Sequence, residues 1–207
     1  MMPPAGSKAA QGHELQIATN CLGPFLLTKL LTPLLKRTAA LPDTPPGSVR
    51  VTWAASAAVD LFSPPHGLTL DGHRTYVPHP KGNTQIDYGA TKAGNYFLAS
   101  QFALRHPRGV VTNAWNPGNL WTGLQRNSNF VVRFLGSYLL HSAQFGAYTE
   151  LWAGWAEEAG GEGCSGRYVW PWGRFGGVRE DVEGELGEGG RAEGFWRWCE
   201  RETEKYA

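Results

Sequence analysis

The most constraining feature of the chain is the succession of an apolar run, a helical segment and a second apolar run between residues 49 and 115. Residues 49–56 (VRVTWAAS) and 110–115 (VVTNAW) are rich in β-branched side chains, which favours strands. Residues 85–105 carry apolar side chains at helical spacing, and the sequence HPRG then ends the helix. A strand, a helix and a strand in this order predict two parallel strands joined by a crossover.

The rest of the chain continues the alternation of helices and strands. Residues 13–37 are predicted to form a helix that bends at Pro24 or Pro33, because proline removes a helical hydrogen bond. The other predicted elements are a loop over 57–84, a short helix over 128–140, a helix over 142–158 with Ser142 as its N-cap, a strand over 166–170 and a helix over 191–204. This order predicts an α/β architecture with a mainly parallel sheet, and 207 residues fit one domain.

Candidate functional residues lie where the predicted strands end. Ser56 closes the first strand, and the segment NPGNLWT (116–122) follows the second. Ligands of parallel α/β sheets bind at the carboxyl ends of the strands. We therefore expect these residues to share one site.

Charge, cysteines and apolar runs exclude several classes of function. The formal net charge is +1 with acids and bases mixed along the chain, so no nucleic-acid partner is expected. The three cysteines and six histidines show no metal-ligand or disulfide spacing, so no metal site is predicted. The apolar runs are too short to span a bilayer and no leader pattern is seen, which predicts a cytoplasmic protein.

Tyr88 and Lys92 lie four residues apart in the predicted helix 85–105. That spacing puts both side chains on one helix face, where an ammonium group lowers the pKa of a tyrosine from its usual value of about 10. Such a tyrosine can act as an acid or a base. A solvent-exposed pair on a helix surface is the alternative, and the spacing alone does not choose between the two.

Four segments resemble, in the same order, the motifs of the short-chain dehydrogenase/reductase family. They are TNCLGPFLLTKLLTPLL with Asn20 and Gly23, VRVTWAAS with Ser56, YGATK with Tyr88 and Lys92, and NPGNLWTGL with Pro117, Gly118 and Thr122. The likeness is to retinol-dehydrogenase-like members of fungal type, and it extends from the first residues to SGRYVWPWG near residue 173. The ordered set is far more specific than any one motif.

The resemblance implies an NAD(P)-dependent oxidoreductase that interconverts a carbonyl and an alcohol by hydride transfer. Tyr88 is then the acid or base, and Ser56 hydrogen-bonds the reacting oxygen. Lys92 binds the nicotinamide ribose and lowers the pKa of Tyr88, and Asn20 supports Lys92 through a water molecule. The residues implied to contact the cofactor, with NADP slightly favoured over NAD, are Asn20, Tyr88, Lys92, Pro117, Gly118, Asn119 and Thr122.

One part of the family pattern is not found in the chain. Family members begin with a strand, a Thr-Gly-x-x-x-Gly-x-Gly turn and a helix whose N-terminus binds the pyrophosphate. We therefore expect residues 1–207 to be an N-terminally truncated member, a partial Rossmann-like doubly wound parallel sheet that lacks the first strands. The strand 49–56 is then expected at an exposed edge of the sheet, and dinucleotide binding is expected to be weak.

Two functions remain open from the sequence. The first is the oxidoreductase activity of the family, with a small lipophilic carbonyl or alcohol as substrate, which the apolar content of segment 123–141 suggests. The second is a catalytically inactive member that acts only as a binding or dimerisation partner. The resemblance places a homodimer interface on helices 85–105 and 142–158.

Overall fold

The computed structural model describes residues 3–80, 82–106, 109–120, 140–161 and 163–207. One sheet has the strand order β1 (Arg50–Ala54), β2 (Val111–Trp115), β3 (Arg167–Trp170) and β4 (Arg174–Gly176). The first three strands are parallel, and β4 pairs antiparallel with β3. The predicted α/β architecture with a mainly parallel sheet is confirmed, although β4 was not predicted. Within the described residues, β1 forms one edge of this sheet.

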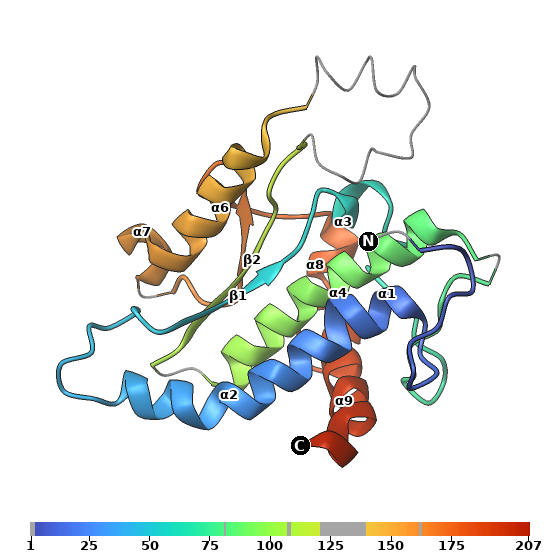
Figure 1. Ribbon diagram of the computed structural model, residues 1–207, viewed down its shortest axis with the longest axis horizontal. Helices are drawn as coiled ribbons and strands as arrows, with labels where there is room; N and C mark the ends of the chain where they lie inside the picture. The colour runs from blue at the N-terminus through green and yellow to red at the C-terminus, as the bar shows by residue number, and fades with distance from the viewer. Residues whose placement is uncertain (1–2, 81, 107–108, 121–139, 162) are drawn as a thin grey trace.

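The crossover between β1 and β2 is the helix α4 (Thr84–Arg105), as predicted. Its first turn is capped by Asn83, whose side chain accepts hydrogen bonds from the backbone N–H groups of Gln85 and Ile86. Helix α4 covers one face of the sheet, and α6 (Ala143–Trp155) with the short α7 (Glu157–Gly160) lies on the opposite side of the strands (Figure 1). Beyond the carboxyl ends of β1 and β2, Ala57 and Asn116 line one pocket.

The first helical segment is interrupted where the sequence predicted a bend. It consists of α1 (Leu15–Ile17), a π-helical turn η1 (Ala18–Leu22) and α2 (Gly23–Ala39). Pro24 has no N–H to donate to the carbonyl of Asn20, and the wider turn lies directly before it. Pro33 lies inside α2, which continues past it, and the alternative bend at Pro33 stays a prediction.

Other predicted boundaries differ from the structure in local detail. The predicted loop 57–84 contains α3 (Ala58–Leu61), and α8 (Glu180–Glu183) lies before the last helix, in the Gly/Glu-rich residues 176–190, where no element was predicted. Ser142 precedes α6 as predicted, but its side chain makes no capping hydrogen bond. The final helix α9 (Arg191–Thr203) is confirmed and is followed by the single turn η3 (Glu204–Tyr206). The helix predicted over 128–140 lies mostly outside the described residues.

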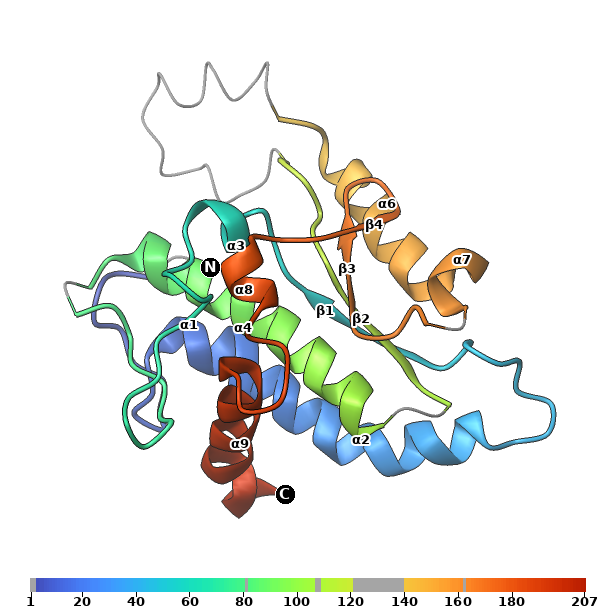
Figure 2. The same cartoon turned by 180° about the vertical axis from the view of Figure 1, so that it is seen from behind.

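Helix α9 packs against α4 and completes the core behind the sheet (Figure 2). Phe195 of α9 is fully buried and stacks on Trp198, with the ring centroids 5.5 Å apart. The close approach of the two helices depends on Gly94 of α4, because a Cβ atom there would lie 2.9 Å from the ring of Phe195. The thiols of Cys21 and Cys199 are fully buried in the same core, and burial raises the pKa of both.

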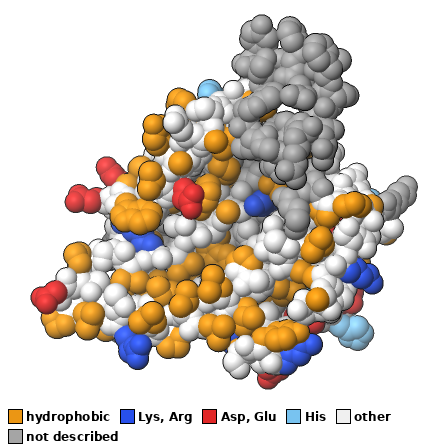
Figure 3. Space-filling model, in the orientation of Figure 1, with side chains coloured by type: hydrophobic (Ala, Val, Ile, Leu, Met, Phe, Trp, Pro, Cys, Tyr) orange, Lys and Arg blue, Asp and Glu red, His pale blue; other side chains and the backbone are white. Residues whose placement is uncertain are grey.

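Helix α2 carries an apolar stripe that the described residues do not cover. Hydrophobic side chains gather along this helix in Figure 3, and its leucines Leu27, Leu30, Leu31 and Leu34 are 41–60% exposed. In the described part of the chain, no helix is long and apolar enough to cross a membrane.

The two helices predicted to form a homodimer interface differ in exposure. Helix α4 is largely buried in this chain, whereas α6 exposes Phe145, Tyr148, Leu151 and Trp155. The homodimer stays a prediction.

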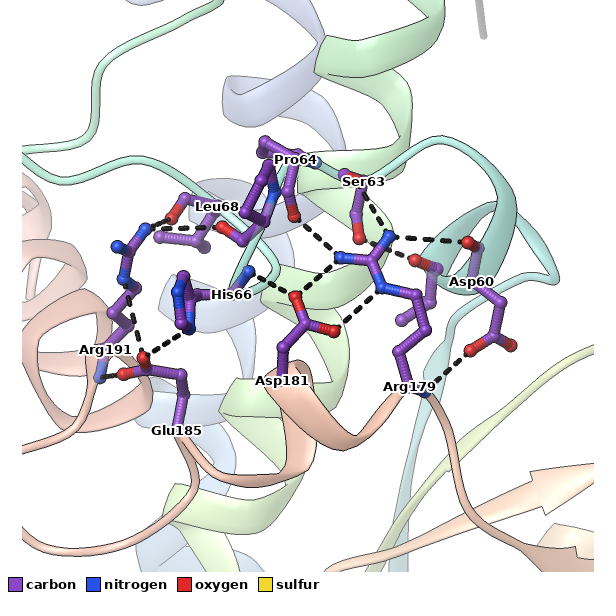
Figure 4. Close-up of polar contacts among 11 residues, drawn as sticks. Asp60, Ser63, Pro64, His66, Leu68, Arg179, Asp181, Glu185 and Arg191 are labelled. Atoms are coloured by element: carbon purple, nitrogen blue, oxygen red, sulfur yellow. Dashed lines mark hydrogen bonds and ion pairs between the residues drawn. The ribbon is translucent and has the colours of Figure 1, made fainter.

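A cluster of polar contacts, here called the clasp, joins residues 60–68 to residues 179–191 (Figure 4). The Asp60 carboxylate accepts a hydrogen bond from the backbone N–H of Arg179 at 2.8 Å, and the Arg179 guanidinium donates to the carbonyl oxygen of Ser63 at 3.0 Å. Asp181 accepts from Arg179 at 2.8 Å and from the backbone N–H of His66 at 2.6 Å. The clasp therefore holds α3, and the chain that follows it, against α8.

The clasp should make the stability of the protein depend on pH through Asp181. The Arg179 side chain holds the pKa of the Asp181 carboxyl well below its usual range. The stabilisation that the ionised Asp181 carboxylate contributes is therefore fully present above about pH 3.9, the pKa of aspartate in the unfolded chain. It is lost as the pH falls through the pKa of Asp181 in the folded protein. We expect Asp181→Asn to lower the free energy of unfolding by roughly 1 kcal/mol at about pH 7 in urea denaturation, and by less at about pH 3.

The control for this prediction is Asp43→Asn, which removes an exposed aspartate in the loop after α2. It is expected to change the free energy of unfolding by less than about 0.5 kcal/mol. Equal destabilisation by Asp181→Asn at both pH values would show that the carboxylate charge is not what stabilises the clasp.

Candidate active site

Ser56, Tyr88 and Lys92 meet at the carboxyl end of β1. Ser56 lies two residues beyond the strand, and its Oγ accepts a hydrogen bond from the backbone N–H of Ala58 at 3.2 Å. Because that contact uses an oxygen lone pair, the Ser56 hydroxyl hydrogen remains free to be donated. The Ser56 side chain also acts on the phenol of Tyr88 and lowers its pKa. The predicted serine and tyrosine are therefore direct neighbours.

The pKa of Tyr88 nevertheless differs from the sequence prediction. Burial of the phenol outweighs the effect of Ser56 and raises this pKa above its usual value. The Lys92 ammonium group lies 5.3 Å from the centroid of the Tyr88 ring, and its Nζ donates to the carbonyl oxygen of Ala54 at 2.8 Å. The predicted lowering by Lys92 is therefore not seen in this arrangement, since the ammonium is directed at β1.

The Ala54 carbonyl holds a second side chain that the sequence did not single out. Asn95 is buried, and its Nδ2 donates to the Ala54 oxygen at 2.8 Å. One backbone acceptor at the end of β1 thus fixes Lys92 and Asn95 together. The available signal was the helical spacing of three between Lys92 and Asn95, which puts them on one face of α4.

Asn20 lies on the π-helical turn and reaches α4 from the side. Its Nδ2 donates to Oγ1 of Thr91 at 3.0 Å, and the Thr91 hydroxyl donates to the carbonyl oxygen of Tyr88 at 2.8 Å. Asn20 and Lys92 line the same groove beside β1. Among the described residues no direct hydrogen bond joins their side chains, and the water-mediated support of Lys92 stays a prediction.

Tyr168 of β3 is the other residue that sequence reasoning missed. Its side chain is fully buried, and its Oη donates a hydrogen bond to the carbonyl oxygen of Ser56 at 2.8 Å. This bond ties Ser56 to the third strand of the sheet. The sequence offered one weak signal: a tyrosine inside a buried strand needs a hydrogen-bond partner for its hydroxyl group.

Pro117, Gly118 and Asn119 follow β2, and Gly118 and Asn119 border a pocket of about 570 Å³ that also reaches Ala57. The side-chain oxygen of Asn116 accepts a hydrogen bond from the Gly118 N–H at 2.9 Å, which holds the turn. Gly118 has a φ of 87°, and a Cβ atom there would overlap the ring of Trp172, so both backbone and packing require glycine. Thr122, the last predicted cofactor contact, lies outside the described residues.

Comparison with known proteins identifies the family of the chain. No family model matches it. Short-chain dehydrogenase/reductases from the fungi Phomopsis amygdali and Pestalotiopsis fici are 40% and 39% identical to this chain, over 100% and 98% of its length. The chain belongs to the short-chain dehydrogenase/reductase family. The family prediction is confirmed, while the retinol-dehydrogenase-like type stays a prediction.

This short-chain dehydrogenase/reductase chain spans 63% and 61% of the lengths of those two relatives. A crystal structure of an uncharacterized protein from Mycobacterium paratuberculosis shares the fold, with a TM-score of 0.61 and 22% identity. That likeness covers 99% of this chain and 63% of the other.

In the described segments, no three His, Cys, Asp or Glu side chains are grouped as metal ligands would be.

Proposed function

We propose that the protein is an NAD(P)-dependent oxidoreductase that interconverts a carbonyl and an alcohol, with Tyr88 as its acid or base. The observation that carries this proposal is the meeting of three side chains at the carboxyl end of β1: Ser56 lowers the pKa of Tyr88, and the Lys92 ammonium group lies 5.3 Å from the centroid of the Tyr88 ring. The family of the relatives supports the same chemistry. The substrate is proposed to be a small lipophilic carbonyl compound or alcohol.

In the direction of reduction, the neutral Tyr88 hydroxyl gives its proton to the carbonyl oxygen of the substrate. The Ser56 hydroxyl donates a hydrogen bond to that same oxygen and stabilises the negative charge that develops there. The Ala58 N–H and the Tyr168 hydroxyl hold Ser56 in place, so little reorganisation is needed during the reaction. The dinucleotide supplies the hydride to the carbonyl carbon when it is bound.

The residues present fit the nicotinamide end of such a cofactor. The Lys92 ammonium group contacts no carboxylate in the described structure, so its remaining N–H donors suit the ribose hydroxyl groups. Gly118 and Asn119 border the pocket that begins at Ala57, and they would contact the nicotinamide. A strand, a Gly-rich turn and a helix of the kind that bind a pyrophosphate are not found together in the described residues.

Transfer of a labelled hydride tests the proposed function directly. The full chain is incubated with an aromatic aldehyde and NADPH or NADH carrying deuterium at the transferred position, and the alcohol product is examined by mass spectrometry. We expect one deuterium in each product molecule, with NADPH as the better donor. A folded protein that transfers no deuterium from either cofactor would favour the inactive binding partner instead.

The pH dependence of reduction should follow the ionisation of Tyr88. Because burial raises its pKa, the phenol stays protonated through the neutral range and loses its proton only above about pH 10. We expect kcat/KM for reduction to be constant from about pH 6 to about pH 9 and to fall at higher pH. Burial also lowers the pKa of Lys92, so this ammonium group loses its charge at a lower pH than a free lysine does. A fall centred near neutral pH would contradict this assignment.

A further inference from the structure

The pocket beside Ser56 has an aromatic wall that no step of the proposed chemistry uses. It contains about 570 Å³, a volume typical of small-molecule sites, and begins at Ala57, the residue after Ser56. The turn between β3 and β4 forms its far side with Trp170 and Trp172. Both indoles keep about two fifths of their surface exposed, at 40% and 43%, although large apolar rings are usually covered.

The two indole rings are held in place by specific contacts. Trp170 donates a hydrogen bond from Nε1 to the carbonyl oxygen of Gly177 at 2.8 Å. His141 meets the Trp172 ring edge to face, with the centroids 4.9 Å apart and an interplanar angle of 85°, and Phe145 lies 5.6 Å from it. Gly118 supplies the space in which the Trp172 ring packs. Rings fixed in this way offer a preorganised surface for a flat ligand.

The pocket also carries an unopposed positive charge. Arg174 is the one Lys, Arg, Asp or Glu among the described residues that line it. Its guanidinium carbon lies over the Trp170 ring, 5.5 Å from the ring centroid, so the charge is next to the aromatic wall. No ion pair of Arg174 is found within the described residues. A guanidinium group binds a carboxylate through two parallel hydrogen bonds.

We infer that the substrate is an aromatic carbonyl compound that carries an anionic oxygen substituent on its ring. The ring stacks on Trp172, the anionic group pairs with Arg174, and the carbonyl faces Ser56 at the opposite end of the pocket. The inference rests on the proposed function and adds the substrate class to it. An aliphatic or uncharged carbonyl compound would leave one of these two contacts unused.

Binding to the full chain without dinucleotide tests the inference separately from catalysis. The probes are para-acetylbenzoate, its uncharged methyl ester and the saturated ring analogue acetylcyclohexanecarboxylate, each titrated by calorimetry. We expect the aromatic acid to bind roughly tenfold more tightly than the ester and on the order of fivefold more tightly than the saturated acid. Equal affinities for the three probes would overturn the inference.

Variants assign each preference to its residue. Arg174→Gln should abolish the preference for the acid over the ester, and Trp172→Leu should abolish the preference for the aromatic over the saturated acid. Arg167→Gln is the matched control, because this arginine stacks on Phe175 at 4.0 Å and does not line the pocket. It should keep both preferences, and loss of the acid preference in this control but not in Arg174→Gln would overturn the assignment.

Turnover distinguishes failure of the inference from failure of the proposed function. Selective binding of para-acetylbenzoate with no hydride transfer would overturn the oxidoreductase proposal and support the pocket as an aromatic-acid site. Hydride transfer to the ester and the saturated acid at the same rate as to para-acetylbenzoate would support the oxidoreductase and overturn the inferred substrate class.

Discussion

Tyr88→Phe is expected to reduce kcat for carbonyl reduction by roughly 10²- to 10⁴-fold, the usual contribution of a positioned acid. The substitution removes the proton that the carbonyl oxygen receives and keeps the ring that packs beneath Lys92. The Ser56 hydroxyl remains beside the reacting oxygen, so some stabilisation of charge survives. The measurement is the initial rate of nicotinamide oxidation by the full chain at saturating substrate.

Tyr148→Phe is the matched control for this loss of rate. Tyr148 lies on α6 and is 56% exposed, so removing its hydroxyl group should leave kcat unchanged. Thermal unfolding of both variants should resemble that of the parent protein, because each change deletes one oxygen atom. Full activity in Tyr88→Phe would show that another group supplies the proton.

Phe195→Ala is expected to lower the free energy of unfolding by about 3–5 kcal/mol, a large part of the roughly 5–15 kcal/mol available to a typical domain. The ring is fully buried between α9 and α4 and touches Trp198. Gly94 lies directly beneath it with no side chain that could move into the cavity. The measurement is equilibrium unfolding in urea, followed by tryptophan fluorescence.

Phe145→Ala provides the comparison, since Phe145 lies on α6 and is 39% exposed. It loses the same atoms from a site open to solvent, and a cost below about 1.5 kcal/mol is expected. Similar costs for the two substitutions would mean that α9 contributes little to the cooperative core. The pair therefore measures how firmly the last helix is attached to the rest of the fold.

The fold was predictable for elements whose own apolar pattern determines which of their side chains are buried. The apolar periodicity of residues 85–105 and the β-branched runs on either side were enough for α4, β1 and β2, because each of these elements buries its own regular pattern. The short elements α3 and α8 were missed, since four residues carry no period. Their positions depend on the clasp, whose partners lie more than 100 residues apart in the sequence.

The candidate site was predictable only as far as its motifs extend. Ser56 and Tyr88 were named from the sequence and lie together in the structure. Asn95 and Tyr168 act through the backbone carbonyls of Ala54 and Ser56, and a contact to the backbone leaves no pattern of side-chain types to read. The sign of the Tyr88 pKa shift also depends on burial and on the direction of the Lys92 side chain, which only the folded chain defines.

The buried thiol of Cys21 makes it possible to follow the opening of the site as a rate. Its Sγ donates to the carbonyl oxygen of Thr91 at 3.2 Å, on the side of α4 that also presents Lys92 and Asn95. A thiol reagent can modify Cys21 only when the core between η1, α4 and α9 opens. The labelling rate of this cysteine, read by mass spectrometry, therefore reports how often the core next to Lys92 opens, in a protein that need not turn over any substrate.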